Sequence, residues 1–223
     1  MNLPHDPVFY GVAAIAVILV GVAKGGFAGL GAAAMPILVL VMDPAPAAAM
    51  LLPILIAPDP RLKTISTAVE TIDDDLRAFI KDMFDTMYDA PGIGLAAIQV
   101  GVPKRVLVID LQDKDEETGK VIRDPRVFIN PEILEESEEL SVYNEGCLSV
   151  PEQYADVQRP AVIKARWQDE QGKAHEEVLD GLLAICLQHE MDHLEGILFI
   201  DHLSKLKRDM VLKKLAKARK MAA

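Results

Sequence analysis

The stretch CLQHEMDHLEGIL, residues 186–198, places two histidines four positions apart, with a glutamate directly after the first. Because residues four apart lie on one face of a helix, His189 and His193 can bind one metal ion through their imidazole nitrogens. Glu190 is turned about 100° from His189 around the helix, so its carboxylate can handle the proton of a metal-bound water. The alternative is a pair of surface histidines among helix-stabilising acids. The apolar residues around the pair favour a metal site, because polar groups on a buried helix need partners.

A catalytic ion usually has a third protein ligand, with one position left open for water. The candidates are His175, His202, an acid or a cysteine. Cys147 stands out because it lies in NEGCLSVPEQ, residues 144–153, whose glycine and proline indicate a chain that approaches a site closely. For a lone cysteine, the alternative is the role of a small buried hydrophobic residue. Cys186 fits that role, and we expect it to line the pocket rather than to bind the ion.

A third stretch, PGIGLAAIQVG, covers residues 91–101. Gly92 and Gly94 allow a ligand or a strand to approach the backbone closely. Gln99 follows an apolar run. Its side chain is either a surface amide on a strand or a donor to a carbonyl oxygen that gains charge during a reaction.

Three segments together resemble the signature motifs of the peptide deformylases, in the same order and at matching separations. They are GIGLAAIQ (92–99), EGCLSVP (145–151) and QHEMDHLEG (188–196). The resemblance extends from about Pro53 to the C-terminus. It implies an α+β fold in which antiparallel strands pack around a central metal-binding helix. It also implies removal of the formyl group from N-formylmethionine at the start of nascent chains, with release of formate.

The same resemblance implies a role for each matched residue. The metal ligands are Cys147, His189 and His193. The catalytic groups are Glu190 as general acid/base, and the side chain of Gln99 and backbone N–H of Leu148 as donors to the oxyanion. The substrate contacts are Gly94, Ile93, Leu182, Ile185 and Cys186. The family uses one divalent ion, Fe²⁺, and works with Ni²⁺, Co²⁺ or, less well, Zn²⁺; one thiolate among imidazoles does not choose between these.

The sequence does not assign one role to each of several charged or polar residues near these motifs. Tyr154 stands where many relatives of this family have an arginine that holds the substrate backbone. Arg159 is a nearby replacement for that contact. Asp192 and Glu195 either orient the ligands or lie on the wetter face of the helix.

The charge is unevenly distributed along the chain. Of the net charge of −11, residues 1–52 carry −1 and residues 53–223 carry −10. This acidity argues against a general nucleic-acid binder and against DNA as a partner. Cys147 and Cys186 are too few for a disulfide-rich scaffold.

Residues 53–223 are expected to form one catalytic domain with strands grouped in the middle and helices at either end. Residues 71–90 have apolar residues at helical spacing, with Thr71 or Asp73 as the cap. Further helices are expected over 180–195 and 202–219. The expected strands are 105–111, 126–131 and 162–168.

Residues 1–52 form an apolar extension that is expected to be helical. Residues 8–42 contain Lys24 as their one charged residue, which allows one tilted membrane span or a short hairpin; the alternative is a buried core helix. The segment GVAKGGFAGLGAAAMPILVLVMDPAPAAAMLLPIL also resembles the opening of the TauE-like sulfite exporters, and it stops near Leu52. An inserted segment would anchor a cytoplasmic catalytic domain to the inner membrane. A fusion product that never inserts is the other interpretation.

The C-terminal segment KLKRDMVLKKLAKARK, residues 205–220, has eight Lys or Arg and one Asp. It is expected to form a helix with one apolar and one basic face. The basic face is either simply solvated, or contacts ribosomal RNA at the peptide exit, or lies on a membrane surface.

Two rival functions remain at this stage. A zinc peptidase with the His-Glu-x-x-His motif would need neither Cys147 nor Gln99. The chain could also be a membrane protein whose soluble part is incidental.

Overall fold

A computed structural model of the chain describes residues 52–115 and 118–221. The chain divides into two units at the Leu52–Pro53 junction, and all described residues except Leu52 belong to the second unit. The helical extension, the membrane span and the exporter-like segment predicted within residues 1–52 lie outside the described residues, apart from the last residues of that segment. Within the described ranges, no helix is both long and apolar enough to cross a membrane.

The first long helix, α4 (Asp74–Asp89), begins directly after Asp73, the second of the two caps that the sequence allows. The side chain of Asp73 accepts a hydrogen bond from the N–H of Leu76 at 2.8 Å and thereby caps the helix. Asp74 and Asp75 lie in the first turn, where acids interact favourably with the helix dipole. The buried side chains follow helical spacing and comprise Leu76, Ile80, Met83, Thr86 and Met87.

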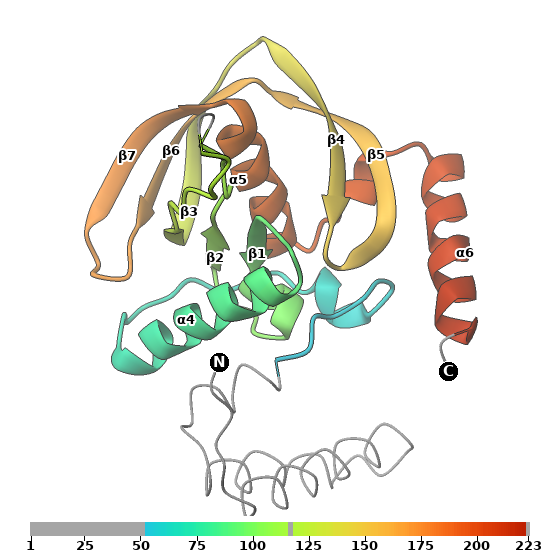
Figure 1. The fold of residues 1–223 in the computed structure, drawn as a ribbon, viewed down its shortest axis with the longest axis horizontal. Helices are drawn as coiled ribbons and strands as arrows, with labels where there is room; N and C mark the ends of the chain where they lie inside the picture. Colours follow the sequence, from blue (N-terminus) through green and yellow to red (C-terminus); the bar gives the residue numbers. More distant parts are fainter. Residues whose placement is uncertain (1–51, 116–117, 222–223) are drawn as a thin grey trace, which may run out of the picture. The chain divides into compact units, whose positions relative to one another are not determined.

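The strands form two antiparallel groups, which Figure 1 shows on either side of helix α5. The larger sheet has the order β1-β2-β3-β6-β7. Its strands are β1 (Gly94–Ala96), β2 (Val106–Ile109), β3 (Arg126–Glu136), β6 (Val162–Gln168) and β7 (Ala174–Asp180). The second group is a long hairpin of β4 (Leu140–Cys147) and β5 (Val150–Pro160).

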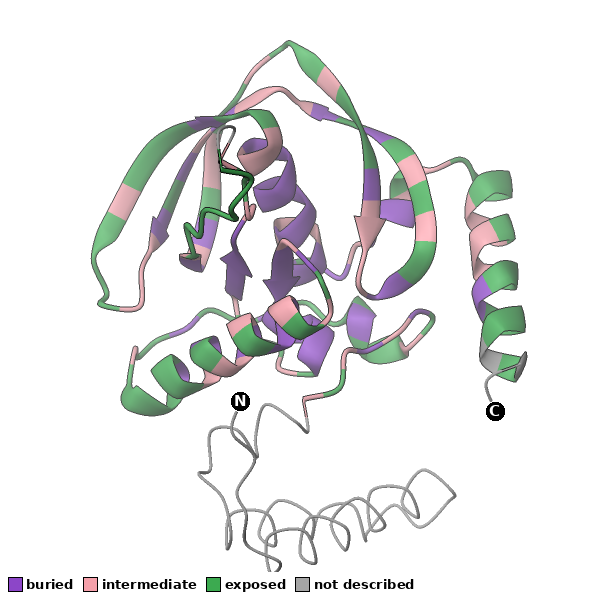
Figure 2. Cartoon of the chain, in the orientation of Figure 1, coloured by how far each residue is buried: buried purple, intermediate pink, exposed green. Residues whose placement is uncertain are grey.

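Helix α5 (Gly181–Leu194) carries the His-Glu-x-x-His motif. Nine of its 14 residues are buried, and most of the helix has the buried colour in Figure 2. One core cluster joins α5 to the large sheet through side chains that include Ile109, Phe128 and Leu187. The helix ends before Gly196, whose φ of 71° and close approach to the carbonyl of Lys63 favour a residue without a side chain. The predicted arrangement of antiparallel strands around a central helix is confirmed.

The three predicted strands correspond to β2, β3 and β6, but β1, β4, β5 and β7 are missing from the sequence-based prediction. Most residues of β4 and β7 are exposed or partly exposed, so their sequences lack the apolar runs that mark a buried strand. In contrast, all four residues of β2 are buried.

The C-terminal helix α6 (Lys205–Met221) begins three residues later than predicted, after the short 3₁₀ helix Phe199–His202. Leu215 is buried in a second core cluster, which also contains Val157 of β5 and Phe199. Leu206 and Met210 are 73% and 52% exposed, so the part of α6 that packs on the domain is narrower than the apolar face predicted from the sequence.

Candidate metal centre and active site

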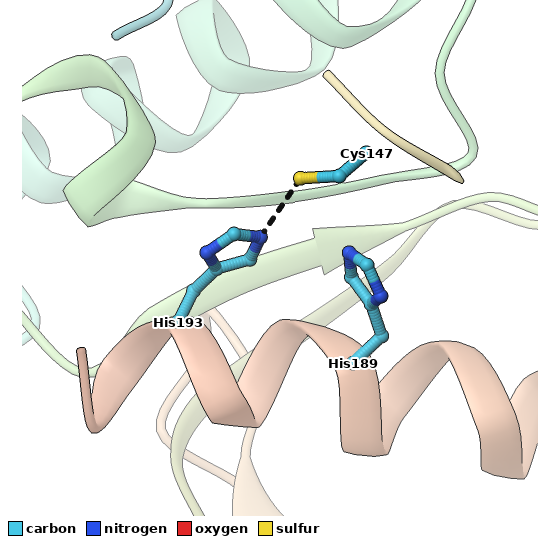
Figure 3. Close-up of side chains that lie close together, drawn as sticks. All are labelled: Cys147, His189 and His193. Atoms are coloured by element: carbon cyan, nitrogen blue, oxygen red, sulfur yellow. Dashed lines mark hydrogen bonds between the residues drawn. The ribbon is translucent and has the colours of Figure 1, made fainter. Parts of the chain in front are cut away.

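Three potential metal ligands converge from two elements. His189 and His193 lie one turn apart on α5, and the thiol of Cys147, at the end of β4, faces them (Figure 3). Each residue offers one ligand atom, and the three atoms lie within 4.8 Å of one another. The Sγ of Cys147 is 3.2 Å from Nε2 of His193, although 46 positions separate the two residues. The fold therefore brings together the three residues that the resemblance implies as ligands.

A buried carboxylate orients the first histidine. Oε2 of Glu145 lies 2.7 Å from Nδ1 of His189. Burial raises the pKa of Glu145, but hydrogen bonds from His189 and Arg159 outweigh it and lower this pKa to about 2. Since the ionised carboxylate can only accept, Nδ1 of His189 carries the proton, and Nε2 is left to face the thiol.

Arg159 connects this carboxylate to the motif helix. It is 5% exposed and donates to Glu145 through Nε at 2.6 Å and Nη2 at 3.0 Å. Its Nη1 donates to Oδ2 of Asp192 at 2.9 Å. His202 also contacts Asp192, at 2.7 Å. A continuous set of hydrogen bonds thus fixes His189 from the side opposite its Nε2.

The donor set fits a divalent ion. Atoms bound at about 2.0–2.3 Å to a tetrahedral ion are about 3.3–3.8 Å apart. The Cys147–His193 pair is 3.2 Å apart, and no pair of ligand atoms is more than 4.8 Å apart. Without an ion, burial lowers the pKa of His189, but its hydrogen bonds with Cys147 and Glu145 outweigh this and raise it well above the ordinary value. The surrounding groups thus favour positive charge at this imidazole, which a divalent ion bound by the three ligands would supply.

Glu190 lies beside this centre without belonging to it. Its side chain is buried, and no hydrogen-bond partner is found for its Oε2 among the described residues. Burial raises the pKa of Glu190 to about 7, although the neighbouring His189 opposes the shift. An added Cβ on Gly94 would lie 2.5 Å from Oε1 of Glu190, so a side chain where β1 passes the carboxylate would displace it. A carboxyl with a pKa near neutrality can both accept and return a proton.

Gln99 also lies at the centre. It is 1% exposed, in the short 3₁₀ helix Ala97–Val100. Its Oε1 accepts from the N–H of Ala96 at 2.8 Å, which fixes the orientation of the amide. Its Nε2 donates to Oγ of Ser149 at 3.1 Å and lies 3.6 Å from Sγ of Cys147. The alternative of a surface amide is therefore wrong.

The comparisons with known proteins agree with this geometry. The family model of polypeptide deformylase matches residues 51–209. A curated peptide deformylase of Rhizorhabdus wittichii is 78% identical over 167 residues, which are 75% of this chain and 94% of that protein. This chain belongs to the peptide deformylase family.

Other members of the family give the same result. The peptide deformylase of Novosphingobium aromaticivorans is 65% identical over 179 residues and is covered to 95% of its length. The crystal structure of a peptide deformylase from Legionella pneumophila has 46% identity and a TM-score of 0.69, over 76% of this chain and 96% of that one. A peptide deformylase of Ehrlichia chaffeensis, solved in complex with actinonin, has 42% identity and a TM-score of 0.69. The chain is a metal-dependent hydrolase that removes the formyl group from N-formylmethionine of nascent peptides.

Family membership decides between the rival functions. The zinc peptidase hypothesis is wrong, and the domain that follows residue 52 is not incidental, because the match covers almost all of it. The exporter-like segment lies outside this match, apart from its last residues.

A cavity of about 630 Å³ opens beside the metal centre of this deformylase. Its lining includes all five predicted substrate contacts: Ile93, Gly94, Leu182, Ile185 and Cys186. It also includes Tyr154, at the position that the sequence analysis linked to the substrate backbone. Tyr143 and, from the segment before α4, Ile54 and Ile56 line it too, and sequence reasoning missed these three as pocket residues. Tyr154 is 70% exposed, and its ring packs so closely on Gly146 that an added Cβ there would lie 2.5 Å away.

The structure also corrects and completes the expected roles of nearby charged residues. Arg159 is not available to replace the arginine of relatives at position 154, because its guanidinium is buried and paired with Glu145 and Asp192. Asp192 is therefore the acid that supports the site, whereas Glu195 pairs with Arg105 at the surface.

The remaining candidates for the third ligand lie elsewhere. His175 pairs with Asp169 and stacks on Trp167, and His202 contacts Asp192. Sequence reasoning missed Glu145 and Ser149 as partners of the site. Their places on either side of Cys147 in the motif EGCLSVP were the available signal.

Proposed function

We propose that Cys147, His189 and His193 hold one divalent ion and that Glu190, Gln99 and Leu148 carry the chemistry of deformylation. The observation that supports this best is the convergence of the three ligand atoms within 4.8 Å, with Glu190 buried beside them. The ion is proposed to be Fe²⁺, as the family resemblance implies. Ni²⁺, Co²⁺ and Zn²⁺ remain alternatives, because these donors do not select among them.

The residues of the chain divide the reaction into proton transfer and charge stabilisation. A bound divalent ion would lower the pKa of water and supply hydroxide near neutral pH. Glu190 accepts the proton that the water loses. As hydroxide adds to the formyl carbon, the carbonyl oxygen gains a negative charge. Gln99 Nε2 and the backbone N–H of Leu148 then donate to this oxygen, each contributing about 3–4 kcal/mol by analogy with other oxyanion holes.

The tetrahedral adduct of hydroxide and the formyl group breaks down when the leaving nitrogen is protonated. Glu190 returns the proton to the methionine nitrogen as the C–N bond breaks, so the products are formate and a free α-amine. The cavity binds the methionine side chain between Ile93, Leu182, Ile185 and Cys186, with Gly94 contacting the substrate backbone.

The test of this function is turnover of formyl-Met-Ala-Ser by the purified full chain, loaded anaerobically with Fe²⁺ or with Ni²⁺. Release of formate in stoichiometric amount with the free amine supports the proposal. Full metal loading without turnover would show that the substrate is something else.

We also propose that helix α6 contacts the ribosome. Its exposed lysines include Lys213, Lys214 and Lys217, on a domain that is otherwise acidic. Binding through phosphate contacts should weaken steeply as salt is raised, because each contact releases counterions.

For the ribosome contact, we expect Lys213→Glu, Lys214→Glu and Lys217→Glu, combined in one variant, to weaken co-sedimentation with ribosomes at low salt. The exposed pair Lys120→Glu and Lys173→Glu is the control and should bind like the wild type. Failure of the wild type to bind even at low salt would remove the proposal and leave a docked terminal helix with a solvated basic face.

A cytoplasmic location is proposed from the substrate, since formylated nascent chains are made there. Contact of residues 8–42 with the inner membrane stays a prediction. If it is correct, a fraction of the full chain should pellet with membranes and resist extraction by high salt. Complete recovery of the chain in the supernatant would contradict it.

A further inference from the structure

One wall of the substrate cavity is the backbone segment 90–94, which leads into strand β1. Ala90, Pro91, Gly92, Ile93 and Gly94 all line the cavity, but β1 starts at Gly94. The carbonyl groups of the preceding residues therefore need partners outside the regular ladder. The carbonyl of Ile93 accepts from the N–H of Asp110 at 2.9 Å, a bond that any residue at that position could donate.

The carbonyl of Gly92 depends on a side chain instead. Nε2 of Gln112 donates to it at 2.7 Å, from just beyond the end of β2. On its other side Gly92 packs closely on Leu148, where an added Cβ would lie 2.7 Å from Cδ1. Leu148 is the proposed backbone donor to the oxyanion. The wall is thus held between Gln112 and the tip of the β4–β5 hairpin.

Gln112 adopts a backbone conformation that glutamine disfavours, with φ of 56°. A buried carboxylate holds it there: Oδ1 of Asp110 accepts from the N–H of Gln112 at 3.1 Å and from that of Asp124 at 3.2 Å. Oδ2 of Asp110 accepts from the hydroxyl of Tyr88 at 2.6 Å. Since Tyr88 lies in the last turn of α4, this carboxylate connects the end of α4, the end of β2 and the loop that follows β2.

We propose that Gln112 is a positioning residue that sets the Gly92–Gly94 wall of the substrate cavity. A glycine would satisfy the positive φ without cost, so the geometry points to the amide as the reason for a glutamine here. The inference rests on the proposed function, because it assigns this cavity to the formylmethionyl end of the substrate. Gln112 does not touch the metal ligands and acts only through the backbone of Gly92.

The experiment compares Gln112→Ala and Gln112→Gly with the wild-type full chain loaded with Ni²⁺. Both variants remove the amide, but glycine accepts the positive φ, so Gln112→Gly should have the higher Tm of the two. We expect both to raise KM for formyl-Met-Ala-Ser by about threefold to tenfold, the loss of one hydrogen bond, without a change in kcat. Gln171→Ala, at an exposed glutamine on the turn between β6 and β7, is the control and should match the wild type.

The pattern across the variants separates positioning from stability. If KM returned to the wild-type value in Gln112→Gly, or if KM were unchanged in both variants, the proposal would be overturned. Calorimetric binding of the product peptide Met-Ala-Ser gives a readout that needs no turnover, and it should be weakened to the same extent. If the wild-type chain did not deformylate, the proposed function would be rejected. Weaker binding of Met-Ala-Ser by the Gln112 variants would then still support the positioning role of Gln112.

Discussion

Replacing Glu190 by glutamine should abolish deformylation while the ion stays bound. The substitution keeps the shape of a side chain that is 4% exposed, but it removes the group that accepts and returns the proton. General acid–base catalysis contributes about 10²–10⁴-fold to the rate. We therefore expect kcat to fall by at least about 100-fold. The measurement is release of formate from formyl-Met-Ala-Ser, with the metal content determined on the same samples.

The control for this variant is Glu195→Gln, the same chemical change at the end of α5. Glu195 pairs with Arg105 at the surface and lies away from the cavity lining, so kcat and metal content should both match the wild type. If Glu190→Gln kept most of its activity with full metal loading, a different base would be required. If it lost the ion, Glu190 would act in metal binding instead.

Replacing Cys147 by serine should remove the ion. A hydroxyl is a far poorer ligand than a thiolate, and two histidines on one helix are left to hold the ion. The loss of affinity should exceed the roughly 10–100-fold that is typical when a partner of a ligand is removed. Competition with a chelator measures the affinity, and metal analysis after gel filtration measures the occupancy.

Cys186→Ala provides the matched control for the thiol. Cys186 is buried on α5, and its thiol is not one of the three clustered ligand atoms. This variant should retain one equivalent of metal. Full occupancy in Cys147→Ser would show that the third ligand is another residue and would reject the proposed centre.

The glutamate two positions before Cys147 illustrates what was missing from the sequence-based prediction. Glu145 looks like an ordinary strand acid in a sequence with many acids. Its role depends on Arg159, which pairs with it across the β4–β5 hairpin, and on His189 of α5. A buried charge is retained only where its partners converge, and these partners come from different elements. No regular spacing in the sequence relates Glu145 to Arg159 or to His189.

The two tyrosines at the cavity mouth are a second example. Tyr143 and Tyr154 are 42% and 70% exposed, so neither has the burial that marks a core aromatic residue. Both line the cavity from the β4–β5 hairpin, where Tyr143 lies on β4 and Tyr154 lies on β5 opposite Gly146. The sequence marked Tyr154 as a departure from the arginine of relatives. The prediction that Arg159 makes the contact of that arginine with the substrate backbone was wrong.

The amino-acid sequence by itself determined the parts of this protein that depend on local spacing. Helix α5 and its paired histidines follow from the period of the helix, and side-chain chemistry limited the cap of α4 to Thr71 or Asp73. The three motifs together indicated the family. Only the tertiary structure decided which residues meet: Cys147 with His193, Arg159 with Glu145, and Gln112 with Gly92. Such contacts arise from packing between distant segments, whose geometry is set by the whole core and not by the residues on either side of each partner.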